Sequence, residues 1–416
     1  MTIVEFFDDV SINNMASCIA IKPDKIIFIG EKKPMHKQEA AYLRVINACG
    51  IDVSFEYRHI NRNSVQQIVS VLTEIAENED CCTFDLTGGE DLVLVAMGIV
   101  FEKFRDSGKI QMHRFNVRTG MVFDCDKDGF LPDVEKPMLS VKDNIMLYGG
   151  CIVPYDGRKG TYNWIFDAEF AADLKNMWDI CKSDPGLWNA QTGTIGFMAE
   201  KSRSVGNPLS VSANKSHIED LMKKRRSKFV WVPGVVHAFY ENGFITELDD
   251  SADYVSFTFK NEQIKQCLTK EGTLLELMVL LFALSAKEKD GSATFNDAVN
   301  GAYIDWDSAL HDITDDEKDT ENEIDVLLMK GLVPVFISCK NGYVDETELY
   351  KLNTVAGKFG GPYAKKVLVA TYQGKSTEDG QKYFRQRAED MQIQLIENVH
   401  GLSPEAFAKK IKNLSV

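Results

Sequence analysis

Asn322-Glu-Ile-Asp-Val-Leu-Leu-Met-Lys-Gly-Leu-Val-Pro-Val-Phe-Ile-Ser-Cys-Lys-Asn-Gly342 is the segment from which the architecture of this chain can be worked out. Two apolar runs, 324–329 and 333–339, flank the turn dipeptide Lys-Gly, which is the pattern of a buried β-hairpin. Asp325 interrupts the first run, and Lys340 follows the second. Because an antiparallel return brings the two ends of a hairpin together, we expect Asp325 and Lys340 to lie side by side.

A carboxylate inside an apolar strand is costly to bury unless a cation or a proton satisfies it. A divalent metal ion would satisfy Asp325, and Lys340 would then be placed to orient or activate a water molecule beside the metal. A second carboxylate, Glu276, is the only charge between Leu274 and Leu284, in a segment that reads as a buried helix. Its partner is either the same metal ion or, if one helix face is solvated, water.

The hairpin resembles the core of the PD-(D/E)xK, or restriction-endonuclease-like, nuclease family. The resemblance implies that Glu276 and Asp325 bind Mn²⁺ or Mg²⁺, that the main-chain carbonyl of Cys339 adds a metal ligand, and that Glu276, Asp325 and Lys340 are catalytic. The family usually has an acid two residues before the lysine, where this chain has Ser338. This departure leaves the number of metal ions open.

Other charged residues of the C-terminal part have two readings each. Glu323 shares a strand face with Asp325 and is either a further ligand or solvated. Lys358 approaches a scissile phosphate or is a surface lysine. The acidic run Asp312–Glu321 is predicted to be a solvated loop.

Length and composition indicate an intracellular protein of several domains. The chain has 416 residues, 44% of them hydrophobic and 26% charged, as in ordinary globular proteins. Its net charge of −15 gives no overall attraction to nucleic acid, so any such groove is local or takes a small anion. Nine cysteines without a C-x-x-C pair, and a start without a basic signal region, lead us to expect a cytoplasmic location.

The first 110 residues alternate between strand-like and helical patterns. Strands are expected at 2–7, 26–29, 53–57 and 82–86, with helices between them, which predicts a parallel sheet covered on both faces. Ligands of such sheets bind beyond the carboxyl ends of the strands, where loops 8–15, 30–35 and 87–91 are expected. The last of these loops contains the Thr-Gly-Gly of Asp85-Leu-Thr-Gly-Gly89 and leads into a helix. It is either a phosphate-binding turn or a plain turn.

A Rossmann-like half with Asp-Leu-Thr-Gly-Gly at this strand, joined to a nuclease-like half, resembles the CARF (CRISPR-associated Rossmann fold) effectors of type III CRISPR systems. The resemblance implies a homodimer that binds cyclic tetra-adenylate across its two-fold axis. It further implies metal-dependent cleavage of DNA or RNA, as single strands or nicked duplexes, with low sequence specificity and a role in antiviral defence. The predicted ligand-binding residues are Ser11, Asn13, Asn14, Gly30, Lys32, Lys33, Thr87, Gly88, Gly89 and Glu90.

Three domains are expected on this basis. Residues 1–150 form the CARF domain, residues 266–416 the nuclease-like domain, and residues 151–265 a connecting region or small subdomain. Within that region, 184–214 is predicted to be a loop or linker and 229–240 to be strands. Two alternatives stay open: a CARF-type transcription regulator with a winged helix at 217–260, and a repair or restriction endonuclease that no cyclic nucleotide controls.

One motif in the first domain suggests a calcium site. Asp124–Glu135 fits the EF-hand loop pattern, but an alternating strand-like pattern precedes it, and Pro132 and Pro137 oppose a following helix. We therefore predict a β-hairpin that binds no calcium.

Overall fold

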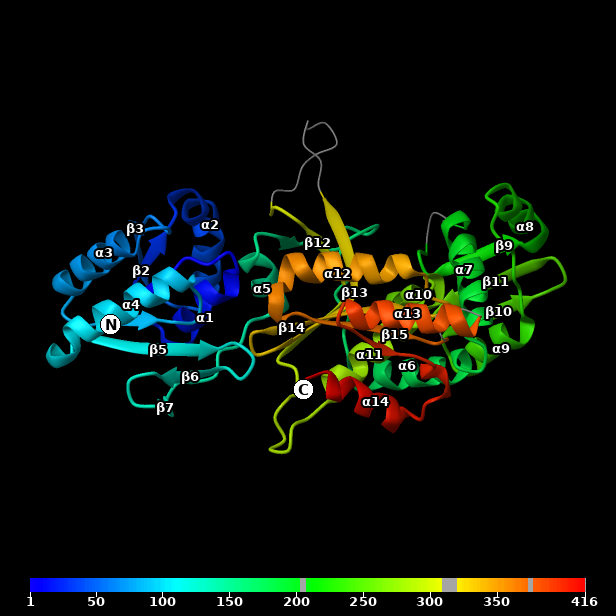
Figure 1. Ribbon diagram of the computed structural model, residues 1–416. Helices are drawn as coiled ribbons and strands as arrows, with labels where there is room; N and C mark the ends of the chain where they lie inside the picture. The colour runs from blue at the N-terminus through cyan, green and yellow to red at the C-terminus, as the bar shows by residue number, and fades with distance from the viewer. Residues whose placement is uncertain (203–206, 309–319, 373–376, 416) are drawn as a thin grey trace.

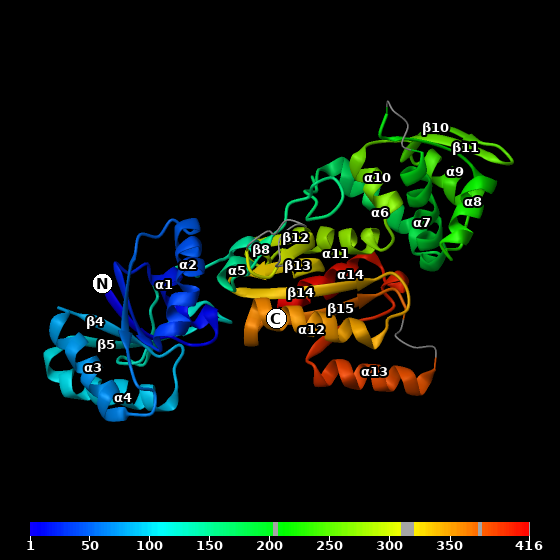
Figure 2. The same ribbon diagram turned by 90° about the horizontal axis from the view of Figure 1, so that it is seen from above.

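The computed structural model describes residues 1–202, 207–308, 320–372 and 377–415. The chain forms three units in a row, with the N-terminal unit at one end and a middle unit that contains the C-terminus (Figures 1 and 2). The third unit, built by the part of the sequence between the other two, lies at the opposite end. The acidic run predicted as a solvated loop lies outside the described residues as far as position 319.

The N-terminal unit is a seven-stranded sheet in the order β3-β2-β1-β4-β5-β6-β7. The strands β1 to β5 are parallel, and β6 and β7 return antiparallel. Their bounds are β1 Thr2–Phe6, β2 Lys25–Gly30, β3 Ser54–His59, β4 Cys82–Asp85, β5 Ile110–Asn116, β6 Met121–Asp124 and β7 Gly129–Phe130. The predicted parallel sheet is thus confirmed.

Helices cover both faces of this sheet, because alternate residues of the central strands point to opposite sides. Ile3 and Phe28 pack with α1 (Ser11–Ile21) and α2 (Lys32–Ala48), whereas Val4 and Ile27 pack with α3 (Val65–Asn78) and α4 (Asp91–Phe104). Two of the predicted edge loops are shorter than expected, because α1 begins at Ser11 and α2 at Lys32. A short helix, α5 (Val141–Leu147), is capped by Ser140 and Asp143.

The segment with the EF-hand pattern is a hairpin of β6 and β7, as predicted. One carboxylate oxygen of Asp124 accepts hydrogen bonds from the main-chain N–H groups of Asp126 and Lys127. The Asp126 carboxylate accepts a hydrogen bond from the N–H of Met112. No helix follows the motif directly, since residues 131–140 have no helical structure and α5 begins only at Val141. The carboxylates therefore stabilise the hairpin; that it binds no calcium stays a prediction.

The middle unit is a six-stranded sheet in the order β16-β15-β14-β13-β12-β8. Helices α11 (Thr273–Ser285) and α14 (Pro404–Lys412) pack on one face, and α12 (Glu346–Gly360) and α13 (Glu378–Asp390) on the other. The strands are β8 Cys151–Ile152, β12 Asp297–Asp305, β13 Glu321–Lys330, β14 Val333–Lys340, β15 Lys365–Ala370 and β16 Ile393–Ile396. The predicted hairpin and the helix that carries Glu276 are confirmed.

The third unit contains the helices α6 (Ala168–Cys181), α7 (Pro185–Lys201) and α10 (Glu262–Thr269) and a three-stranded sheet. Between α7 and α10 the order is β9 (Ser210–Asn214), α8 (Lys215–Lys224), α9 (Pro233–Glu241), β10 (Ile245–Asp250) and β11 (Tyr254–Phe259). With the sheet order β10-β11-β9, this is the arrangement of a winged helix.

Two secondary-structure predictions in this unit are wrong. The segment 184–214 contains α7, whose first turn is capped by the Asp184 carboxylate and begins with Pro185. Its glycines serve packing, because a Cβ at Gly196 would lie 2.2 Å from the carbonyl oxygen of Thr269. The segment 229–240 is largely helical, again with a proline in the first turn, at Pro233.

Candidate functional site

The hairpin of β13 and β14 brings Asp325 and Lys340 together, as the sequence predicts. The Lys340 Nζ lies 3.6 Å from the Asp325 Oδ2. The same oxygen accepts the main-chain N–H of Cys339 at 2.6 Å and the hydroxyl of Ser338 at 3.1 Å. Ser338, at the position where the resembled family has an acid, therefore orients Asp325 through a hydrogen bond.

Asn300 of β12 fixes Glu276 against Asp325. Its Nδ2 donates to the Glu276 Oε2 at 3.0 Å and to the main-chain oxygen of Asp325 at 2.8 Å. Glu276 lies in the first turn of α11. Gly301 lies opposite Asp325 in the pair of β12 and β13 and has a φ of 57°. Burial and, second, the Asp325 carboxylate raise the pKa of Glu276, while the Asn300 hydrogen bond lowers it. A buried carboxylate that a second carboxylate makes more costly to ionise is a group whose charge a bound cation would stabilise.

Lys340 lies between two carboxylates. Besides Asp325, it contacts the Oε2 of Glu348 on α12 at 3.1 Å, and Glu348 also pairs with Lys351 at 2.8 Å. Burial by itself lowers the pKa of Lys340, but Asp325 and Glu348 outweigh burial and hold that pKa above its usual value. The ammonium group is therefore charged and held between the two carboxylates.

Asp325, Lys340 and Glu348 line a cleft of about 350 Å³, whereas Glu276 and Asn300 are not among its lining residues. Tyr303, Glu321 and Glu323 from β12 and β13 lie on one side and Glu348, Lys351 and Val355 from α12 on the other. Glu323 thus reaches the cleft, and burial followed by Asp325 raises its pKa. Its role as a ligand stays a prediction, and Lys358 is not among the lining residues.

The donor set fits a divalent metal ion, although the described residues hold no group of three or more His, Cys, Asp or Glu close enough to bind one. Mg²⁺ and Mn²⁺ sites in such enzymes need one or two carboxylates and fill the other positions with water and substrate phosphate. Glu276 and Asp325 would supply them. The Cys339 carbonyl remains a predicted third ligand.

Two residues of this site were not found from the sequence. Asn300 is a buried amide in an apolar strand, and that polar residue was the signal that could have found it. Glu348 gives no such signal, because it sits among other charges at the start of a surface helix.

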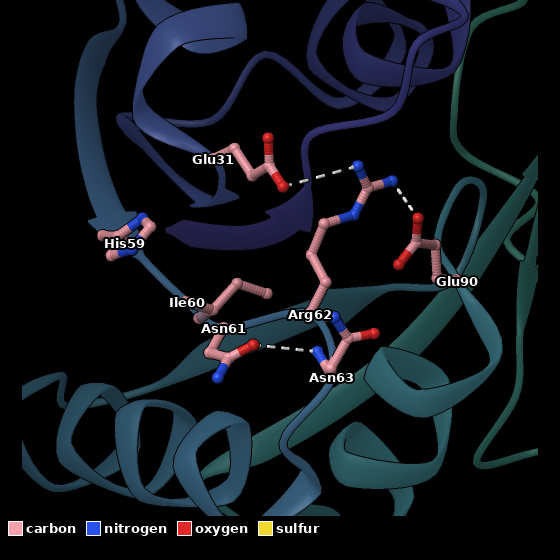
Figure 3. A pocket seen from close by; sticks show the side chains of 7 residues that line it. All are labelled: Glu31, His59, Ile60, Asn61, Arg62, Asn63 and Glu90. Atoms are coloured by element: carbon pink, nitrogen blue, oxygen red, sulfur yellow. Dashed lines mark hydrogen bonds and ion pairs between the residues drawn. The ribbon is translucent and has the colours of Figure 1, made fainter.

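A second cleft, of about 720 Å³, lies at the carboxyl edge of the N-terminal sheet (Figure 3). It is lined by residues that follow β2 and β3 and precede α4: Glu31, His59, Ile60, Asn61, Arg62, Asn63 and Glu90. The guanidinium of Arg62 lies between two carboxylates, in a hydrogen-bonded ion pair with Glu90 and 3.9 Å from Glu31. It also packs 5.5 Å from the ring centre of Phe6. Of the predicted ligand residues, Glu90 lines this cleft, and Arg62 was missed.

The remaining predicted ligand residues have different surroundings. Ser11, Asn13 and Asn14 are buried in α1, and Asn14 exchanges hydrogen bonds with the main chain of Asp8. The Thr87 hydroxyl accepts the N–H of Phe115, which anchors the loop 87–90. Gly88 is buried against Asp8 and Asn13, Gly89 has a φ of 130°, and a Cβ at Gly30 would lie 3.1 Å from Phe7 Cβ. The side chains of Lys32 and Lys33 are outside the described part of the chain.

One of these residues contacts the middle unit. The hydroxyl of Tyr363, between α12 and β15, donates to the Asn13 Oδ1 at 3.0 Å. A Cβ at Gly88 would lie 3.4 Å from the Asn13 Cβ. The loop 87–90 and the nuclease-like sheet are therefore connected through Asn13.

Two solved structures share this fold along their whole length. The protein VC1899 from Vibrio cholerae is 17% identical, with a TM-score of 0.71, and the match covers 100% of this chain and 97% of VC1899. Can2 from Sulfobacillus thermosulfidooxidans, solved in complex with cyclic tetra-adenylate, is 13% identical, with a TM-score of 0.64 and coverage of 100% and 99%. The predicted α/β architecture is confirmed, and the chain has the same overall fold as VC1899 and Can2.

No protein-family model matches the chain, and no curated protein matches it by sequence. Among the helices of the described residues, none has the length and apolarity needed to cross a bilayer.

Proposed function

We propose that this chain is a metal-dependent nuclease that cyclic tetra-adenylate activates, with a role in CRISPR antiviral defence. The observation that carries the proposal is the clustering of Glu276, Asp325 and Lys340: Asn300 joins Glu276 to Asp325, and Lys340 lies 3.6 Å from Asp325. The full length of the chain has the fold of a protein solved with that activator. The cytoplasmic location and the homodimer expected from the sequence are part of the proposal.

The residues of the nuclease cleft have distinct roles in this proposal. Glu276 and Asp325 hold Mn²⁺ or Mg²⁺, with the Cys339 carbonyl, and the metal supplies charge stabilisation at the scissile phosphate. Lys340 orients the attacking water and offsets the charge that develops on the phosphate. Asn300 positions Glu276, and Glu348 positions Lys340.

The N-terminal unit binds the activator in this proposal. Main-chain N–H groups of Thr87-Gly88-Gly89 at the start of α4 take phosphate, and a dimer presents two such loops to a ring with two-fold symmetry. Arg62 adds a cation to the same edge of the sheet. A phosphate of the activator would compete with the Glu31 and Glu90 carboxylates for the Arg62 guanidinium. Binding of the activator can shift the equilibrium between the inactive and active arrangements of the nuclease units only as far as the activator binds the active arrangement more tightly.

Cleavage assays test the proposal directly. A nicked plasmid, a single-stranded DNA and a single-stranded RNA are incubated with the chain, with Mn²⁺ or EDTA and with or without cyclic tetra-adenylate. We expect cleavage that needs both metal and activator. Full-rate cleavage without any cyclic oligoadenylate would instead support an ungated endonuclease.

The winged helix of the third unit does not favour a transcription regulator. Its hairpin of β10 and β11 exposes Glu247, Asp249 and Asp253, and α9 between Pro233 and Glu241 has no lysine or arginine. Both elements would meet the phosphates of bound DNA with the wrong charge.

A further inference from the structure

Two stacked tyrosines lie on the loops that follow β14 and β15, close to Lys340 of the nuclease cleft. The ring of Tyr343 is 70% exposed and stacks on the ring of Tyr372, with centroids 5.4 Å apart and an interplanar angle of 23°. Tyr372 in turn packs against the ring of His400, with centroids 5.0 Å apart. We call Tyr343 and Tyr372 the tyrosine platform. It presents the large ring of Tyr343 to solvent.

Hydrogen bonds fix the second ring of the platform to the strand that carries Lys340. The main-chain N–H of Thr371, just before Tyr372, donates to the main-chain oxygen of Lys340 at 3.1 Å. The Nδ1 of His400 donates to the main-chain oxygen of Thr371. The main chain next to Tyr372 is therefore bonded to Lys340 on one side and to His400 on the other.

The first ring of the platform is held close to Lys340 as well. Asn341, between Lys340 and Tyr343, exchanges hydrogen bonds with the side chain of Asn189 on α7. Tyr343 follows Lys340 by three residues, so their Cα atoms are at most roughly 11 Å apart. That distance is about three nucleotides of a stacked strand, at about 3.4 Å each. A strand whose scissile phosphate lies at Lys340 therefore has neighbouring bases within reach of the platform.

Charge alone does not hold a nucleic-acid strand at the nuclease cleft. One divalent ion would only bring the formal charge of the lining residues to zero, so no surplus of positive charge is left for the other phosphates. Near the platform, burial and then the Asp184 carboxylate raise the pKa of Tyr372, so its hydroxyl stays neutral and the adjacent charge is negative. Stacking on an aromatic ring supplies affinity that does not depend on charge. The charged residues that line the cleft are Glu321, Glu323, Asp325 and Glu348 against Lys340 and Lys351.

We propose that the tyrosine platform stacks an unpaired base of the substrate strand next to the cleavage site. Tyr343 offers the exposed ring, and Tyr372 and His400 support it. Because the bases of a duplex are already stacked on one another, only a single-stranded segment can use the platform. The nuclease therefore selects single strands. This inference rests on the proposed function, to which it adds the class of substrate and the residue that selects it.

Fluorescence anisotropy in EDTA tests the platform without cleavage, both with and without cyclic tetra-adenylate. The labelled probes are a thymidine dodecamer, an abasic strand of the same length and a duplex of the same length. We expect Tyr343→Ala to bind the thymidine strand about fivefold or more weakly than wild type, and to bind the abasic strand and the duplex as wild type does. Tyr343→Phe keeps the ring and should bind like wild type. The matched control is Tyr383→Ala, which removes a tyrosine that is 75% exposed on α13 and should leave binding unchanged.

Cleavage of the thymidine strand with Mn²⁺ and cyclic tetra-adenylate gives a second readout. Tyr343→Ala should raise KM and leave kcat near the wild-type value, because stacking binds the substrate and the transition state equally. Equal affinity of Tyr343→Ala and wild type for the thymidine strand overturns the platform, and so does an equal loss of affinity for the abasic strand. Wild type that binds the thymidine strand through Tyr343 but cuts no strand refutes the proposed function and supports the platform, so the two failures are distinguishable.

Discussion

Two substitutions of Asp325 separate its charge from its hydrogen bonds. Asparagine keeps a side-chain oxygen that accepts from the Cys339 N–H and the Ser338 hydroxyl, whereas alanine removes it. Cys339 is 4% exposed, so its N–H would be left without an acceptor in a buried place. We expect Asp325→Ala to lower the free energy of unfolding by about 1–3 kcal/mol.

Asp325→Asn has two opposing effects on stability. It removes the ion pair with Lys340, whose side chains are 32% and 18% exposed, a pair worth about 0–1 kcal/mol. It also removes the like charge that raises the pKa of Glu276, which is a gain. The free energy of unfolding should therefore stay within about 1 kcal/mol of wild type.

Urea unfolding followed by tryptophan fluorescence measures the stabilities, and cleavage with Mn²⁺ and cyclic tetra-adenylate measures activity. Both variants should cut at least about 100-fold more slowly, because each lacks a charged metal ligand. Mn²⁺ should raise the melting temperature of wild type but not of Asp325→Asn. Near-wild-type cleavage by Asp325→Asn would refute the metal assignment, and equal stability of the two variants would refute the hydrogen-bond argument.

Three further predictions follow from the N-terminal unit. Gly88→Ala places a Cβ 2.9 Å from the Asp8 Oδ2, so the concentration of cyclic tetra-adenylate that gives half-maximal cleavage should rise by about tenfold. Gly98→Ala is the control, because Gly98 is exposed on α4 and its Cβ would have nothing within 4 Å. This variant should leave the half-maximal concentration unchanged and raise the free energy of unfolding by about 0.5–1 kcal/mol. An equal response in the two variants would argue against the loop. Tyr363→Phe removes the hydrogen bond to Asn13 and should change the ratio of activated to basal cleavage by about two- to tenfold; an unchanged ratio would mean that this contact transmits nothing. Calcium should leave the melting temperature of wild type unchanged, because the hairpin turn uses its carboxylates on main-chain N–H groups, and a clear upward shift would restore the EF-hand reading.

Local patterns in the sequence were sufficient to predict those parts of the structure that depend on residues close together in the chain. Strand and helix alternate in the first 110 residues, and this period alone predicts a parallel sheet covered on both faces. The proximity of Asp325 and Lys340 follows from a two-residue turn, because the register that pairs Val326 with Ile337 puts Asp325 level with Ser338, two residues from Lys340. Local composition misled at α7, where glycines that suggested a loop instead let the helix approach Thr269.

The sequence by itself therefore determined the order of the elements in the first 110 residues, the hairpin, and Glu276, Asp325 and Lys340 as the charged groups of the candidate site. Only the tertiary structure decided which distant residues complete the sites. Asn300 joins Glu276 to Asp325 from a neighbouring strand, and Glu348 contacts Lys340 from α12. The periodicity of the sequence does not predict such contacts, because they depend on how helices and sheets pack against each other. That packing is set by apolar surfaces that are far apart in the chain.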